Sequence, residues 1–232
     1  MLGLPDTITA CLFDLDGVLT TTAEVHAHAW KEMFDGFLGD RGEPPFELPR
    51  DYDEYVDGKP RLDGVRAFLA ARGIAADEEL VRRLGERKNE LVLTHIRTEG
   101  VKVYEGSVRY VEAARDAGLR RAVVSSSANA REVLRAAGIE HLFEAVVDGL
   151  VAAREGLPGK PAPDTFLAGA RALATPPRHA AVFEDALVGV EAGRRGGFGF
   201  VVGVDRSGQA EALKARGADI VVSDLNELLE AP

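Results

Sequence analysis

The chain has 232 residues, of which 46% are hydrophobic, so it is long enough for one large domain or for a core domain with a smaller second one. Its formal net charge of -10 disfavours a nucleic-acid partner or an anionic membrane surface, because both need a basic footprint. A small phosphorylated substrate is not excluded, since a few local Lys and Arg residues are enough to bind it.

The single cysteine, Cys11, cannot form an internal disulfide or a cysteine-based zinc site, and we expect a buried thiol. No basic segment precedes the first apolar stretch, and no apolar run is long enough to span a bilayer. We therefore expect a cytoplasmic protein without a signal peptide, with no membrane or nucleic-acid partner. The sequence leaves the oligomeric state open and is compatible with a monomer.

The chain begins with a strand and continues into a helical region. The apolar run Thr9–Phe13 predicts a short buried strand. Between residues 22 and 98 the pattern predicts helices only, at Thr22–Phe37, Asp51–Val56, Lys59–Arg72 and Glu78–Ile96. The Gly- and Pro-rich stretch Gly39–Pro49 predicts a loop among them.

After Gly100 strands and helices alternate. Strands are expected at Leu119–Val124, Ala145–Val147, Ala180–Phe183, Gly199–Val202 and Asp219–Val222. Helices are expected at Ser107–Ala117, Ala128–Ala137, Pro163–Leu173, Leu187–Arg195, Gln209–Arg216 and Leu225–Glu230. This alternation predicts an α/β fold, a Rossmann-like doubly wound parallel sheet with helices on both faces.

The first strand must join this sheet, because the helical region offers it no partner. We therefore expect a core of residues 1–21 plus 99–232 and an inserted small all-helical cap of residues 22–98. The insertion point places the cap above the carboxyl end of the first strand, where ligands bind in such sheets.

Two acids follow the first strand, in Asp14-Leu15-Asp16-Gly17. Side chains alternate along a strand, so Asp14 and Asp16 would share a face and repel each other unless a cation lies between them. Hard oxygen ligands favour Mg²⁺. The alternative is that both acids are ordinary loop residues before an Asp-Gly turn.

Polar residues also follow the later strands. Ser125-Ser126-Ser127-Ala128-Asn129 follows one, Glu184-Asp185 follows another, and Lys160 lies in a loop before a helix. Each has a purely structural interpretation, as a helix cap, a solvated lysine or acids favoured by a helix dipole. Their combination with Asp14 and Asp16 at one rim of a parallel sheet instead provides the groups that phosphoryl transfer requires.

The motifs Asp14-Leu15-Asp16-Gly17-Val18-Leu19-Thr20, Val124-Ser125, Lys160-Pro161 and Glu184-Asp185, in this order, resemble the haloacid dehalogenase superfamily. Within it the chain is most similar to the β-phosphoglucomutase subfamily. The resemblance implies that Asp14 is the nucleophile and Asp16 the general acid and base. It implies that Ser125, Ser126 and Lys160 bind the phosphoryl group. The implied Mg²⁺ ligands are Asp14, the main-chain carbonyl of Asp16, Glu184 and Asp185. The presence of Asp16 favours phosphate esters, since dehalogenases of this fold do not need a second aspartate.

The predicted cap carries further similarities to mutases. By resemblance the substrate-binding residues are His26, Gly58, Arg61 and Lys88 of the cap and Ser127 and Asn129 of the core. Arg61 suits a second phosphate, which a guanidinium binds in bidentate fashion. Two positions depart from the pattern, since Ala128 and Asp57 stand where mutases have lysines. Whether Lys59 compensates is left open.

Three functions follow from these expectations. The first is a Mg²⁺-dependent β-phosphoglucomutase-like enzyme that converts β-glucose 1-phosphate to glucose 6-phosphate through an aspartyl-phosphate. The second is a sugar-phosphate phosphatase with the same intermediate. The third is a catalytically silent protein that binds phosphate or Mg²⁺, which the presence of Asp14, Asp16 and Lys160 disfavours.

Overall fold

A six-stranded, entirely parallel sheet forms the centre of the computed structural model, which describes residues 2–230. The strand order is β3-β2-β1-β4-β5-β6. The strands are β1 (Ala10–Phe13), β2 (Arg120–Val124), β3 (Ala145–Val147), β4 (Ala180–Glu184), β5 (Phe200–Val204) and β6 (Ile220–Val222). The order reverses at β1, which pairs with β2 on one side and β4 on the other. Such a reversal opens a ligand-binding crevice at the carboxyl ends of the strands.

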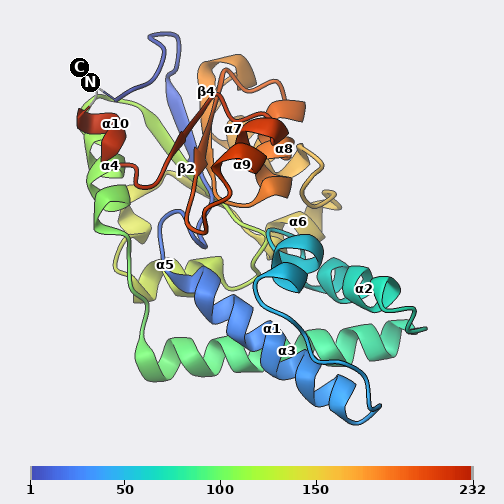
Figure 1. Cartoon of the computed structure of the whole chain (residues 1–232). Helices are drawn as coiled ribbons and strands as arrows, with labels where there is room; N and C mark the ends of the chain where they lie inside the picture. The colour runs from blue at the N-terminus through green and yellow to red at the C-terminus, as the bar shows by residue number, and fades with distance from the viewer. Residues whose placement is uncertain (1, 231–232) are drawn as a thin grey trace.

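Helices cover both faces of the sheet (Figure 1). On one face lie α7 (Asp164–Ala172), α8 (Leu187–Arg195) and α9 (Ala210–Arg216), and on the other α4 (Glu105–Asp116), α5 (Ala130–Ala136) and α10 (Glu227–Glu230). Side chains alternate along β1, so successive residues pack against the helices on opposite faces of the sheet. Leu12 packs with Phe166 of α7, whereas Phe13 packs with Tyr110 of α4. The predicted α/β class with helices on both faces is confirmed.

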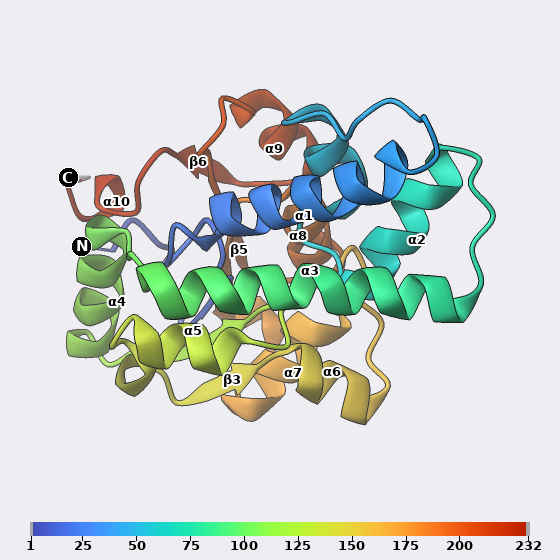
Figure 2. The same cartoon turned by 90° about the horizontal axis from the view of Figure 1, so that it is seen from below.

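Residues 22–98 form helices and loops, without a strand, as predicted. They comprise α1 (Thr22–Gly39), the short π-helical turn η1 (Tyr52–Val56), α2 (Arg61–Ala71) and α3 (Glu78–Glu99). An aromatic cluster holds them together, with Phe34 against Trp30, Phe46 and Phe68. Figure 2 shows α1 and α3 running side by side, and Figure 1 shows them below the sheet. None of the helices among the described residues is long and apolar enough to cross a membrane.

Two connections join this helical unit to the sheet, and they are hydrogen-bonded to each other. The Thr21 amide donates to the Lys102 carbonyl at 3.0 Å, and the Tyr104 amide donates to the Leu19 carbonyl at 2.9 Å. At the far end of α3, the Asp77 side chain caps the helix by accepting from the Leu80 amide at 2.8 Å. The two segments that enter and leave the helical unit are thus held together by main-chain hydrogen bonds.

Several boundaries differ from the predictions. The helix α2 begins at Arg61 rather than at the predicted Lys59, because Pro60 disfavours helical backbone at the residue before it. The helix after β2 begins at Ala130 rather than Ala128. Three short helices were not predicted: α6 (Gly149–Glu155), η2 (Glu140–Leu142) and η3 (Pro177–His179). The predicted core also includes residues 1, 231 and 232, which lie outside the described residues.

Candidate active site

A cavity of about 460 Å³ lies between the helical unit and the carboxyl ends of the strands. Its walls include every predicted site residue except Lys160: Asp14, Asp16, His26, Gly58, Arg61, Lys88, Ser125, Ser126, Ser127, Asn129, Glu184 and Asp185. The strands therefore bring together side chains that lie up to 171 positions apart in sequence, as between Asp14 and Asp185.

Lys160 does not line the cavity itself, but its buried ammonium contacts two of the acids that do. Its ammonium is 2.5 Å from Asp14 Oδ1 and also donates to Glu184 Oε1. Burial alone would lower the pKa of Lys160, but the two carboxylates outweigh burial and raise it. Lys160 is therefore a fixed positive charge behind Asp14.

Asp16 lies in a different hydrogen-bond network from Asp14. Thr22 donates to its Oδ1, and the Ser125 hydroxyl donates to its Oδ2 at 3.4 Å. Burial raises the pKa of Asp16, against the opposing effect of the Thr22 hydrogen bond. Two carboxylates with different surroundings can take different chemical roles.

His26 of α1 lies between Asp16 and Lys88. Its Nε2 is 3.5 Å from Asp16 Oδ1, and its Nδ1 is 2.7 Å from Lys88 Nζ. Burial, followed by the charges of Lys88 and Arg61, lowers the pKa of His26 well below its usual value. Burial also lowers the pKa of Lys88 to about 7. A neutral His26 that accepts from Lys88 at Nδ1 presents its Nε2 hydrogen towards Asp16.

The loop after β2 meets the helical unit at the outer end of the cavity. The Ser126 hydroxyl donates to the Gly58 carbonyl at 2.8 Å, so this side chain joins the loop after β2 to the helical unit. The Ser127 hydroxyl accepts from the Asn129 amide at 3.2 Å. A Cβ on Gly58 would lie 2.8 Å from Val188, so only glycine fits here.

The acids at the strand ends provide donors for a hard cation. Burial raises the pKa of Asp14, with repulsion from Asp16 adding to it, and burial and then Asp57 raise that of Asp185. A cation would offset this repulsion. A Cβ at Gly17 (φ +88°) would lie 1.7 Å from Asp185 Oδ2, so glycine lets Asp185 approach the loop that carries Asp16.

Glu184 is less available as a ligand. Its Oε1 accepts from Lys160 and its Oε2 accepts from the Ala186 amide at 2.9 Å. In the part of the chain that the structure describes, no three Asp, Glu, His or Cys side chains form a ready ligand set. The Asp14 and Asp185 carboxylates are thus the acids left to hold a cation, whereas bonds from the Asp16 carbonyl and from Glu184 stay predictions.

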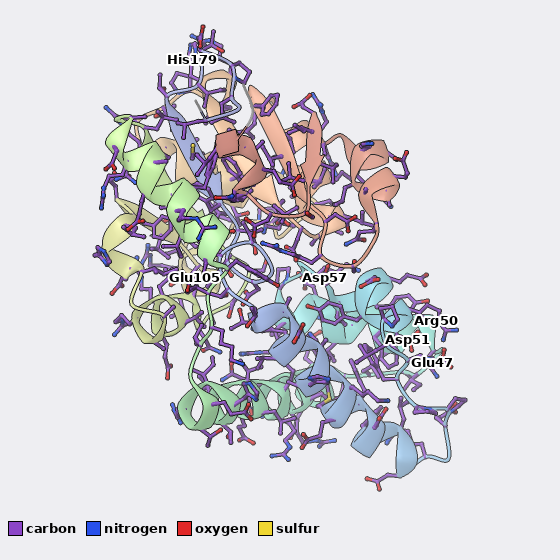
Figure 3. All side chains as sticks on the ribbon, turned by 60° about the vertical axis from the view of Figure 1, so that its left-hand side comes forward. Glu47, Arg50, Asp51, Asp57, Glu105 and His179 are labelled. Carbon is purple, nitrogen blue, oxygen red and sulfur yellow. The ribbon has the colours of Figure 1, made fainter. Side chains whose placement is uncertain are left out.

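Some residues of the site were not among the predicted site residues. Asn89 of α3 accepts hydrogen bonds from Arg61 and Asn129, and Thr22 holds Asp16. Asp57 lines the cavity and lies where the helical unit meets the core (Figure 3). The only sequence indication for Asn89 was its place beside Lys88.

The fold and this arrangement of acids around a buried lysine define an enzyme of the haloacid dehalogenase-like hydrolase family, to which the chain belongs. The model of that family matches residues 8–197. The resemblance inferred from the sequence motifs is thereby confirmed.

Within this family, the chain is similar to several β-phosphoglucomutases. The chain is 50% identical to a β-phosphoglucomutase of Mycobacterium bovis over 99% of this chain and 94% of that protein. It is 33% identical to the β-phosphoglucomutase of Bacillus subtilis, over 94% of this chain and 91% of that one. A crystal structure of β-phosphoglucomutase from Clostridium difficile superposes with a TM-score of 0.79 at 29% identity, covering 95% of this chain and 93% of that one.

Proposed function

We propose that this protein is a Mg²⁺-dependent β-phosphoglucomutase that converts β-glucose 1-phosphate to glucose 6-phosphate. The observation that carries the proposal is the separation of the two aspartates into distinct networks, Asp14 with Lys160 and Asp16 with Thr22 near His26. This is the division expected between a nucleophile and a proton-transferring acid. The 50% identical relative of that name supports the same substrate.

In the proposed first step, an Asp14 oxygen attacks the phosphorus of a phosphate ester, and the bond from phosphorus to the sugar oxygen breaks. Asp16 donates its proton to that leaving oxygen. In the second step a sugar hydroxyl attacks the phosphorus of the phosphate on Asp14, and the bond from phosphorus to the Asp14 oxygen breaks. Asp16 takes the proton of that hydroxyl, which restores both carboxyl groups. Transfer through a covalent intermediate divides one difficult displacement into two easier ones.

The remaining residues bind the phosphoryl group and keep its charge in place. Lys160 and Ser125 face its oxygens, and the rigid link from Lys160 to Glu184 keeps the ammonium positioned before the reaction. A Mg²⁺ held by Asp14, Asp185 and the Asp16 carbonyl would supply charge neutralisation for the phosphoryl oxygens. Arg61, Ser127 and Asn129 would bind the second phosphate of a glucose bisphosphate intermediate.

We also propose that residues 22–98 act as a cap domain over a core of residues 1–21 plus 99–232. Its own apolar cluster and its two hydrogen-bonded connections support independent movement of the cap. The cap carries His26, Lys88 and Arg61, so its position relative to the core determines whether the site is complete.

One observation favours a second candidate, a sugar-phosphate phosphatase. Asp57 lines the cavity at a position where the resemblance places a lysine, and Ala128 replaces another. A carboxylate repels a second phosphate, which a mutase must bind and a phosphatase need not. In the phosphatase, water replaces the sugar hydroxyl in the second step.

The deciding experiment supplies Mg²⁺, β-glucose 1-phosphate and a trace of β-glucose 1,6-bisphosphate, and measures glucose 6-phosphate and free phosphate together. The mutase produces glucose 6-phosphate without free phosphate. Phosphate release equal to the substrate consumed would refute the mutase and support the phosphatase. The Asp14→Asn variant should lose both activities, and turnover retained in it would refute the nucleophile.

A further inference from the structure

The side-chain amide oxygen of Asn89 occupies the point where two predicted substrate-binding residues converge. Arg61 Nη1 of α2 donates to it, and so does Asn129 Nδ2 of the core, at 2.8 Å. Figure 2 shows α3, which carries Asn89, running beside α5, which Asn129 precedes. One neutral acceptor thus joins two cap helices and the core at the outer end of the cavity.

Arg61 is half-buried and lacks the anion that such a guanidinium normally has. Within the described residues no carboxylate lies within ion-pair distance of it, and its Nε is buried without a hydrogen-bond partner. Burial lowers the pKa of Arg61, which Glu86 only partly opposes. A partly desolvated cation without an anionic partner is costly, so the geometry calls for an anionic oxygen close to where Asn89 Oδ1 now lies.

We propose that Asn89 is a positioning residue whose amide oxygen stands in for an oxygen of the second phosphate of a sugar bisphosphate. In the substrate-free enzyme it aligns Arg61 with Asn129, and the phosphate displaces it on binding. This inference rests on the proposed function, since it needs a bisphosphate. Displacement is favourable because hydrogen bonds from Arg61 to a phosphate are charge-assisted, whereas those to an amide are not.

The exchange has a consequence for the cap. Asn89 now links the cap to the core through Asn129, and the only other side-chain hydrogen bond between the two units at this end runs from Ser126 to Gly58 among the described residues. When the phosphate replaces Asn89 Oδ1, the same two donors join cap and core through the ligand. The contact between cap and core is therefore kept while the ligand enters, and Asn89 competes with that ligand.

The test measures binding without turnover. In the Asp14→Asn protein with Mg²⁺, calorimetric titration with β-glucose 1,6-bisphosphate gives its Kd. Asn89→Ala removes the competitor, and we expect binding to tighten by roughly fivefold, the size of one modest hydrogen bond. Asn89→Asp places a carboxylate on Arg61, and we expect binding to weaken by at least about tenfold. The exposed neighbour Glu90→Ala is the matched control and should not change the Kd.

Opposite signs for the two substitutions are the decisive result, because a residue that only supports the fold would weaken binding in both variants. Weakening in both, or no change in both, would overturn the inference. If Asn89→Ala does not fold, as judged by its melting temperature, Asn89→Ser takes its place with the same expected direction.

Arg61→Ala separates this inference from the proposed function. If Arg61→Ala leaves the bisphosphate Kd unchanged, Arg61 does not bind the second phosphate. Both this part of the proposed function and the inference about Asn89 are then refuted. If Arg61→Ala weakens binding and Asn89→Ala weakens it too, the second-phosphate site stands and only the role of Asn89 is refuted.

Discussion

At the scale of single residues, surroundings rather than residue type distinguish Asp14 from Asp16. Asp14 contacts a buried ammonium, whereas Asp16 contacts two hydroxyls and lies near an imidazole. Burial raises the pKa of both carboxyls, and the Lys160 ammonium opposes this rise at Asp14, which favours the ionised form that the proposed attack needs. The hydroxyls that donate to Asp16 are neutral, which suits its proposed role as proton carrier.

The first prediction concerns Asp16. Asp16→Asn should lower kcat for β-glucose 1-phosphate by roughly 10²- to 10⁴-fold, the usual contribution of a general acid and base. The first step with p-nitrophenyl phosphate should suffer less, because its leaving group departs without a proton. Burst kinetics of p-nitrophenolate release measure this. Asp6→Asn, at an exposed acid that does not line the cavity, is the control, and an equal loss with both substrates would contradict the proton role.

The second prediction concerns Asp57. Burial and the acids around it raise its pKa from 3.8 to about 7. A carboxyl whose pKa is raised on folding costs nothing below pH 3.8 and becomes destabilising as the pH rises towards 7. Asp57→Asn should therefore raise the melting temperature of the metal-free protein at pH 8 but not at pH 4. Melting curves from pH 4 to 8 test this, and a gain that is constant with pH would contradict the shift.

At the scale of elements, the loop between β1 and α1 is held by a residue from the far end of the chain. Arg206, after β5, donates from Nε to the Gly17 carbonyl at 2.8 Å and from Nη1 to the Ser223 carbonyl at 2.6 Å. Its guanidinium also lies 3.5 Å from the centre of the Tyr104 ring. Arg206 therefore fixes both the loop that carries Asp16 and the connection that returns from the cap.

The third prediction follows from these contacts. Arg206→Ala should lower the free energy of unfolding by about 1–3 kcal/mol, because it leaves main-chain carbonyls without their donor. It should also lower kcat more than it raises KM, since the catalytic loop loses its support while the substrate-binding residues stay. Urea unfolding and steady-state kinetics measure the two effects. Arg178→Ala, at an exposed position, is the control. Equal losses of stability and kcat in Arg178→Ala and Arg206→Ala would show that the contacts of Arg206 are not the cause.

At the scale of the whole molecule, the sequence predicted what depends on periodicity and on strand ends. The sheet followed from alternating apolar segments, and the placement of Asp14, Ser125 and Glu184 at one rim followed from their positions at strand ends. The helix α6 was missed because none of its residues is buried, so no apolar pattern marks it; Asp148 as its N-cap and Gly156 at its end were the only indications.

Contacts between the cap and the core could not be predicted in the same way. The hydrogen bonds from Arg61 and Asn129 to Asn89 join segments whose distance depends on how the helical unit docks, and periodicity carries no information about docking. The bond from Ser126 to the Gly58 carbonyl is of the same kind. Resemblance identified some of these positions, but their partners came only from the structure.

The last prediction concerns the balance of charge across the whole molecule. The chain has a net charge of -10, and its cavity gathers Asp14, Asp16, Glu184 and Asp185, of which Asp14 and Glu184 accept hydrogen bonds from Lys160. Burial raises the pKa of each of these acids, so the metal-free protein bears the cost of keeping them together. A cation that binds only the folded state recovers this cost.

Mg²⁺ at 100 times its Kd should therefore stabilise the fold by about 2.7 kcal/mol. For a chain of this size that corresponds to a rise in melting temperature of roughly 5–10 °C. Calorimetry with and without EDTA measures it. Asp185→Asn should reduce the rise while increasing the stability of the metal-free protein, because it removes both a ligand and a source of repulsion; Asp6→Asn should change neither. A Mg²⁺ response that survives Asp185→Asn in full would place the cation elsewhere.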